Sequence, residues 1–178
     1  MDYGARVSAL LQYSSQSLPL TRAELVAHPQ LQAMEREQAA TLFPGARDAD
    51  AAFSGLLLLL GGWEQSHELS QNNSSPEGSY WHAIAHRIEP DSANAGYWFR
   101  RIGRHPIFGE LYERASTILT QHNSVGWKLK STWDPFLFIS WCEQARFDPA
   151  SERKSVAIAI QQAEWHLLFD WCVTAFSR

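Results

Sequence analysis

Apolar residues recur at helical spacing along most of the chain, and no segment alternates between apolar and polar residues with the period of a β-strand. The pattern predicts helices over residues 3–13, 31–42, 51–60, 63–71, 78–88, 92–102, 108–121, 135–144 and 151–175. It therefore predicts an all-α fold: a single compact domain of about eight helices, an irregular bundle that covers residues 1–178.

Several helix starts are marked by residues that can accept hydrogen bonds from the first backbone N–H groups. Thr21 is followed by Glu24 at the spacing of a capping box. Asp48 precedes a strongly apolar run, and Asp91 or Ser92 precedes another helical pattern. The leucines at 56–60 make the helix after Asp48 apolar on most sides, so we expect it to be central and buried.

Composition narrows the classes of function. The 178 residues carry 15 Lys and Arg against 19 Asp and Glu, whereas nucleic-acid-binding domains usually have a basic excess. The run Leu56–Leu60 is far shorter than a membrane span, and residues 1–20 lack the pattern of a secretory signal. We therefore expect a cytoplasmic protein that binds neither nucleic acid nor membrane. Cys142 and Cys172 each follow a tryptophan in an apolar run and are expected to be buried thiols.

The segment from Glu77 to Pro106 concentrates the side chains that can carry chemistry, with three histidines, two Tyr-Trp pairs and four arginines. On a helix, His82 and His86 lie one turn apart on the same side. Imidazoles at this spacing suit a divalent metal ion, or a general acid–base pair. Two hydrogen-bonded interior histidines that orient helices would show the same spacing.

The preceding helical pattern adds a third imidazole. Glu64, His67, Glu68 and Gln71 recur at spacings that form one polar stripe, as they also would on a fully solvated helix. Glu64 and His67 form a single Glu-x-x-His, whereas carboxylate-bridged di-iron sites need two copies. The remaining metal hypothesis is a mononuclear site that uses His67, His82 and His86 to hold zinc, iron or manganese.

Aromatic and basic residues around these histidines predict a ligand pocket, with residues 63–106 as the site segment. The predicted substrate-binding residues are Tyr80, Arg87, Tyr97, Trp98 and Arg101. The aromatic rings would form the walls, and an arginine would hold an anionic group by charge-assisted hydrogen bonds. The arginines could equally form an internal ion network with Glu77, Glu89 and Asp91.

The same segment resembles a family of uncharacterised bacterial and fungal proteins. The likeness rests on Gly78-Ser79-Tyr80-Trp81-His82, His86-Arg87, Glu89-Pro90-Asp91, Tyr97-Trp98-Phe99-Arg100-Arg101, Gly103 and His105-Pro106. It extends upstream to Gly55–Leu59 and Ser66-His67, and covers about residues 53–111. No activity is established for that family, so the resemblance implies no catalytic role. Ile88 and Gly96 stand where the family pattern has Arg and Lys.

Three functions are consistent with these features. The first is a small helical enzyme for metal-assisted hydrolysis or acid–base chemistry on a small anionic substrate, with His82, His86, His105 and Glu77 as catalytic candidates and Glu64 as a possible partner. The second is a non-catalytic module that binds a small ligand, and the third is a structural protein whose polar residues fix helix packing. A homo-oligomer is compatible with all three. The first requires imidazoles from separate helices to meet at one hollow.

Overall fold

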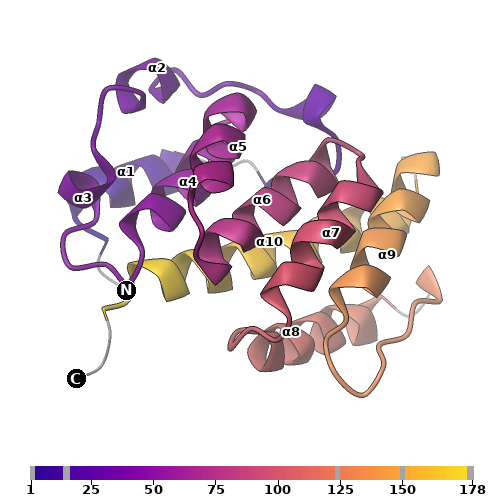
Figure 1. Cartoon of the computed structure of the whole chain (residues 1–178). Coiled ribbons are helices and arrows are strands. Elements are labelled where there is room, and N and C mark those ends of the chain that lie inside the picture. The colour runs from indigo at the N-terminus through magenta and orange to yellow at the C-terminus, as the bar shows by residue number, and fades with distance from the viewer. Residues whose placement is uncertain (1–2, 14–16, 123–124, 149–150, 176–178) are drawn as a thin grey trace.

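Helices form in the structure where the sequence supplies end caps and an apolar stripe. The computed structural model describes residues 3–13, 17–122, 125–148 and 151–175 (Figure 1). Within these ranges the chain forms ten α-helices, a short 3₁₀ helix and no β-strand, which confirms the all-α prediction. Eight of the α-helices span nine residues or more, as the predicted number requires. The helices are α1 (Ala5–Tyr13), η1 (Arg22–Glu24), α2 (Leu31–Met34), α3 (Ala39–Leu42), α4 (Ala49–Leu59), α5 (Trp63–Asn72), α6 (Pro76–Ile88), α7 (Ser92–Ile102), α8 (Phe108–Gln121), α9 (Pro135–Phe147) and α10 (Glu152–Val173).

Helix α4 is the buried central element that the leucine run predicts. Its N-terminus is capped by Asp48, whose carboxylate accepts a hydrogen bond from the Ala51 N–H at 2.9 Å. All residues from Ala51 to Leu60 are buried. A β-carbon added at Gly55 would lie 2.5 Å from the Trp81 ring of α6. Glycine at this position therefore allows α4 and α6 to approach closely.

Helix α6 is as deeply buried as α4. Ser75 caps it by accepting a hydrogen bond from the Gly78 N–H at 2.9 Å, and Pro76 occupies the first turn. Every residue from Gly78 to Ile88 is buried. In Figure 1, α6 runs through the middle of the molecule between α5 and α7, and α10 passes behind it. The candidate residues on α6 are therefore held by helices on several sides.

The connection from α6 to α7 is short and firmly bonded. Of the two predicted caps it is Asp91 that caps α7, by accepting a hydrogen bond from the Asn94 N–H at 3.0 Å. The Asp91 N–H donates in turn to the His86 carbonyl at 2.9 Å. Helix α7 ends before Gly103, whose φ of 65° lies in the left-handed region that favours glycine. These bonds fix the residues that follow His86.

Two predictions near the N-terminus are wrong. The pattern over 31–42 forms two separate four-residue helices, because only Met34 and Ala39 within them are buried and the polar residues 35–38 interrupt the apolar stripe. The expected capping box at Thr21 produces only the 3₁₀ turn η1, and no side chain caps that turn. Neither segment buries enough apolar surface to support a longer helix.

The structure contains a continuous hydrophobic core, and both cysteines are buried. Buried side chains from the N-terminal helix to α10 belong to one hydrophobic cluster. Cys142 and Cys172 are free and buried, as predicted. No helix in the described ranges combines the length and the apolar character that crossing a membrane requires.

Candidate metal centre

Three imidazoles from two helices meet beside the core. Helix α5 supplies His67 and helix α6 supplies His82 and His86. The Nε2 atoms of His82 and His86 are 2.9 Å apart, and the Nε2 atoms of His67 and His86 are 3.4 Å apart. One ligand atom from each of the three residues lies within 4.8 Å of the others, so the group could hold a metal ion.

The nitrogen on the far side of two of these rings is already bonded. The Ser70 hydroxyl can donate its hydrogen to the His67 carbonyl at 3.1 Å, which leaves its oxygen to accept from His82 Nδ1 at 3.2 Å. The Glu89 carboxylate, which can only accept, lies 3.0 Å from His86 Nδ1. Glu89 thus places the proton of His86 on Nδ1. With the Ser70 hydrogen on the carbonyl, His82 is protonated on Nδ1 as well and both Nε2 lone pairs point to the centre of the cluster. With that hydrogen on His82 Nδ1 instead, His82 Nε2 donates to His86 Nε2 at 2.9 Å.

Two lone pairs that face each other at this distance repel unless a proton or a cation lies between them. Tetrahedral zinc with Zn–N bonds of 2.0–2.1 Å separates its nitrogen ligands by about 3.3 Å. The two nitrogen separations of 2.9 and 3.4 Å bracket that value. These two of the three nitrogen separations are therefore close to those that a tetrahedral metal ion requires, and the third ligand atom lies within 4.8 Å of the others.

The surroundings favour neutral imidazoles, which is the form that binds metals. Burial lowers the pKa of His67, and the positive charge of a protonated His86 would lower it further. Burial, followed by the neighbouring charges of His67 and His86, lowers the pKa of His82 from 6.5 to about 3. At neutral pH both rings therefore offer lone pairs to a cation.

Aromatic rings cover two of the three histidines. Trp63 stacks on His67 with ring centroids 4.6 Å apart, and Trp98 lies 4.3 Å from His82. The Trp63 indole also donates to the Ala85 carbonyl at 2.9 Å, which joins α5 to α6. Arg101 lies over the outer side of Trp98, 5.0 Å from the ring centroid. The indoles limit the access of water to the imidazoles, so charge interactions there are strengthened.

The three imidazoles differ in their exposure to solvent. His82 is 2% exposed and His86 is 5% exposed, whereas His67 and Glu89 are partly exposed. Tyr97 is 47% exposed and its ring lies 5.6 Å from that of Trp98. Of the predicted substrate-binding residues, Tyr97, Trp98 and Arg101 thus lie together on α7 beside the cluster.

Acidic residues adjoin the cluster at its outer edge. Glu89 and Asp91 form a second group of potential ligands with His86. Asp91 is engaged as the cap of α7, and Glu89 lies 3.8 Å from the Arg22 guanidinium. We therefore regard these carboxylates as outer partners of the three imidazoles. Glu64, considered as a ligand or acid–base partner, is exposed and forms its ion pair with Arg22 instead.

His105 and Glu77 lie together, away from the three imidazoles. His105 Nε2 is 3.7 Å from the Glu77 carboxylate, which also accepts from the Trp171 indole at 2.7 Å. On α6, Glu77 precedes His82 by five residues and His86 by nine, about 8 and 13 Å along the helix axis. His105 is therefore not a member of the group of potential metal ligands that His67, His82 and His86 form. The catalytic roles predicted for these residues stay predictions.

Tyr80 and Arg87 lie in the core rather than beside the cluster. Arg87 forms an ion pair with Glu164 of α10, and both side chains are 0% exposed. The Tyr80 hydroxyl donates to the same carboxylate at 3.0 Å, and Gln161 accepts from the guanidinium at 3.2 Å. Arg87 thus belongs to an internal ion pair, as one of the sequence readings allowed, but its partner is Glu164 rather than Glu77, Glu89 or Asp91. The structure gives no support to its predicted role in substrate binding.

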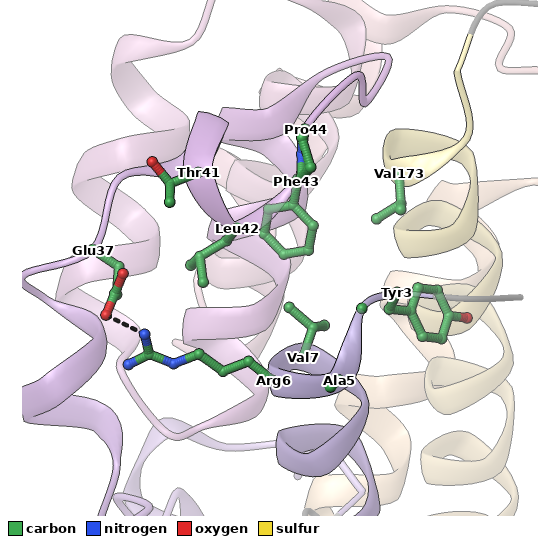
Figure 2. Close-up of a pocket in the computed structure, with 11 residues that line it drawn as sticks. Tyr3, Ala5, Arg6, Val7, Glu37, Thr41, Leu42, Phe43, Pro44 and Val173 are labelled. Atoms are coloured by element: carbon green, nitrogen blue, oxygen red, sulfur yellow. Dashed lines mark ion pairs between the residues drawn. The ribbon is translucent and has the colours of Figure 1, made fainter.

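Cavities elsewhere in the molecule do not involve the three imidazoles. A pocket of about 440 Å³ lies between the start of α1, residues 41–44 and Val173 (Figure 2). The polar side chains on its wall include Arg6 and Glu37, which form an ion pair at 2.5 Å. Two further cavities adjoin α8. Chemical function at the histidine cluster therefore depends on its partial exposure, not on one of these pockets.

Sequence reasoning did not assign the residues that orient the imidazoles. Ser70 follows His67 by three positions on α5, and Trp63 precedes it by four. Both lie on the face of His67, so helical spacing could have revealed them. Glu89 was considered only as an ion-pair partner of the arginines, because Pro90 directly after it leaves its conformation open in the sequence.

Comparison with known proteins adds no further assignment. No protein-family model matches the chain, and neither the curated proteins nor the solved structures give a significant match. The resemblance of residues 53–111 to a family of bacterial and fungal proteins stays a prediction.

Proposed function

We propose that this protein is a small metal-dependent hydrolase whose metal ion is held by His67, His82 and His86. The observation that carries the proposal is the close approach of three imidazole nitrogens, in which the Nε2 atoms of His82 and His86 are 2.9 Å apart and those of His67 and His86 are 3.4 Å apart. A buried arrangement of this kind has a clear physical reason when a cation accepts their lone pairs. The third imidazole, His67, completes a set of three nitrogen donors.

The donor set favours zinc over manganese. Imidazole nitrogen is a borderline ligand that suits zinc, copper, iron and nickel, whereas manganese prefers carboxylate oxygen. Three protein ligands are also the number found in catalytic zinc sites, which keep a fourth position open. The partial exposure of His67 and Glu89 gives solvent a route to that position.

Each neighbouring residue has a role in this proposal. Glu89 holds the Nδ1–H of His86 and makes the ring a stronger donor, and Ser70 does the same for His82. Bound zinc would lower the pKa of a water molecule to about 7, which supports hydrolysis at neutral pH. Arg101 and Tyr97, exposed beside Trp98, would bind an anionic group of the substrate.

Metal analysis and one hydrolysis assay test the proposal. The untagged protein would be stripped with a chelator, reloaded with zinc and dialysed, and its metal content measured by mass spectrometry. We expect one zinc per chain, and cleavage of 4-nitrophenyl acetate or 4-nitrophenyl phosphate that stops when the metal is removed. The His82→Ala/His86→Ala variant should lose both properties. His122→Ala is the matched control, because His122 is partly exposed and pairs with Glu152.

The alternative function is structural. The contacts of His82 with Ser70 and of His86 with Glu89 also help to hold α5, α6 and the α6–α7 turn in place. A protein that binds no zinc, and whose double histidine variant loses several kcal/mol of stability, would support this alternative and would contradict the metal centre.

A further inference from the structure

A cavity of about 680 Å³ lies at the end of the molecule opposite α2, where the turn after α7 meets α8 and the segment before α9. It is larger than the pocket of about 440 Å³ in Figure 2. Its volume is that of a small-molecule site. His105 is one of its lining residues, whereas the three imidazoles of the candidate metal centre are not. A ligand here would therefore bind independently of the metal.

The walls of this cavity are largely aromatic. Phe108 and Tyr112 contribute from α8. Trp133 contributes from the segment between α8 and α9, and Phe136 from the first turn of α9. Phe136 is 44% exposed, although most large apolar side chains of this protein are buried. Exposed aromatic surface at the rim of a concave site favours a ligand with a flat apolar body.

The charges on the lining are not all satisfied within the chain. Lys130 pairs with Asp134 at 2.6 Å, and the other oxygen of Asp134 accepts from the first N–H groups of α9. This pair is therefore internally neutralised. Arg104 is exposed and has no hydrogen bond or ion pair with any residue in the described part of the chain. The carboxylate of Glu113 is the remaining charge on the lining.

N–H groups without an acceptor on the lining indicate whether the cavity favours an anionic or a cationic ligand. The Ile107 N–H donates to His105 Nδ1 at 3.4 Å, so His105 carries its proton on Nε2. Both His105 Nε2 and Trp133 Nε1 are buried and lack an acceptor among the described residues. His105 Nε2 faces the Glu77 carboxylate at 3.7 Å. Outside the Lys130–Asp134 pair, the donors free for a ligand are therefore those of Arg104 and the buried Trp133 indole, and the carboxylate of Glu113 is the opposing charge. A ligand that supplies oxygen acceptors fits this balance better than a cation.

We propose that this cavity binds a small aromatic carboxylate. The ring lies among Phe108, Trp133 and Phe136, and the carboxylate lies on the Arg104 guanidinium. Arginine presents parallel N–H groups that match the two oxygens of a carboxylate.

The test uses three ligands of one shape: 3-phenylpropionate, its amide and the amine 3-phenylpropylamine. Binding to the metal-free full-length protein would be followed by two-dimensional NMR. We expect the acid to shift signals of residues 103–136 and to bind roughly tenfold more tightly than the amide. Arg104→Gln should remove that advantage, and Phe136→Ala should weaken the acid and the amide alike.

Arg100→Gln is the matched control, because Arg100 is exposed on α7 and does not line the cavity. It should bind all three ligands as the wild type does. The proposal is overturned if no ligand binds here, if the acid binds no better than the amide, or if Arg100→Gln has the effect of Arg104→Gln. Tightest binding of the amine would also overturn it, because Glu113 would then be the residue that selects the ligand.

Discussion

At the scale of single residues, the chemistry of the cluster is decided by atoms that do not face its centre. Ser70 and Glu89 bond to the Nδ1 atoms of His82 and His86, and these bonds turn both Nε2 atoms inward. The same two histidines with exposed Nδ1 atoms could exchange tautomers freely. These bonds fix the ring orientations before a metal ion binds, which chance proximity of three histidines would not do.

Removal of one orienting bond should weaken metal binding. In Glu89→Gln the neutral amide replaces the carboxylate that holds His86 Nδ1, so we expect the zinc dissociation constant to rise roughly 10- to 100-fold. The measurement is a competition titration against a coloured chelator. Glu68→Gln on α5 is the control, because Glu68 is exposed and lies in neither group of potential ligands. Equal affinities of the two variants would show that Glu89 does not support the site.

Glu77 should make stability depend on pH in acid. The pKa of Glu77 is lowered from 4.5 to about 2, by His105 first and by the Trp171 indole as well, against a burial effect that raises it. The folded state thus prefers the ionised form, so its stabilising effect is complete above pH 4.5 and is lost as the pH falls to about 2.

Substitution of Glu77 should reveal this effect in urea unfolding. Because His105 lies 3.7 Å away, beyond hydrogen-bond distance, we expect Glu77→Gln to cost about 2 kcal/mol at pH 7, less than the full shift implies. The difference in unfolding free energy between wild type and variant should shrink between pH 4.5 and 2.5. A difference that stays constant over this range would contradict the assignment.

Spacing alone predicted part of the site at this scale. His82 and His86 were grouped because residues four apart share a helical face, and His67 was added from the neighbouring pattern. His105 was grouped with them because it is close in sequence, but the turn after α7 directs it toward Glu77. Periodicity orders residues within one helix and gives no information on how separate helices are arranged.

At the scale of the helices, the position of α6 depends on its close contact with α4. An alanine at Gly55 would place its β-carbon 2.5 Å from Trp81, a fully buried ring that cannot move aside. We expect Gly55→Ala to lower the unfolding free energy by about 1–3 kcal/mol. Gly109→Ala on α8 is the control, since a β-carbon there meets nothing within 4 Å. Urea unfolding that affects both variants equally would contradict this packing.

The ion pair between α6 and α10 provides a second test at this scale. Arg87→Met would leave the carboxylate of Glu164 buried without its cation, so we expect a loss of about 3–5 kcal/mol in unfolding free energy. Arg100→Met, at an exposed position on α7, should change stability little. A loss below about 1 kcal/mol for Arg87→Met would show that the pair is not closed off from water.

Helices were predicted well where a cap and a continuous apolar stripe coincide. Asp48 and Asp91 cap α4 and α7 as the sequence indicated, and the bounds of α8 agree as well. The prediction over 31–42 fails because most of that segment is exposed. The local sequence could not show that α2 and α3 each bury only one residue.

At the scale of the whole molecule, the candidate metal centre joins two helices that the core already holds in place. A metal ion shared by His67 of α5 and His82 and His86 of α6 would bind the folded chain in preference to the unfolded one. Zinc at 100 times its dissociation constant should therefore stabilise the wild type by about 2.7 kcal/mol. This coupling could not be read from the sequence, because it depends on the arrangement of α5 against α6.

Anomalous diffraction at the zinc absorption edge, from crystals of the untagged, zinc-loaded protein, tests the metal centre most directly. The account predicts one strong peak per chain, about 2.0–2.1 Å from the Nε2 atoms of His67, His82 and His86. A map with no peak among these three imidazoles, or with zinc bound only elsewhere, would contradict it.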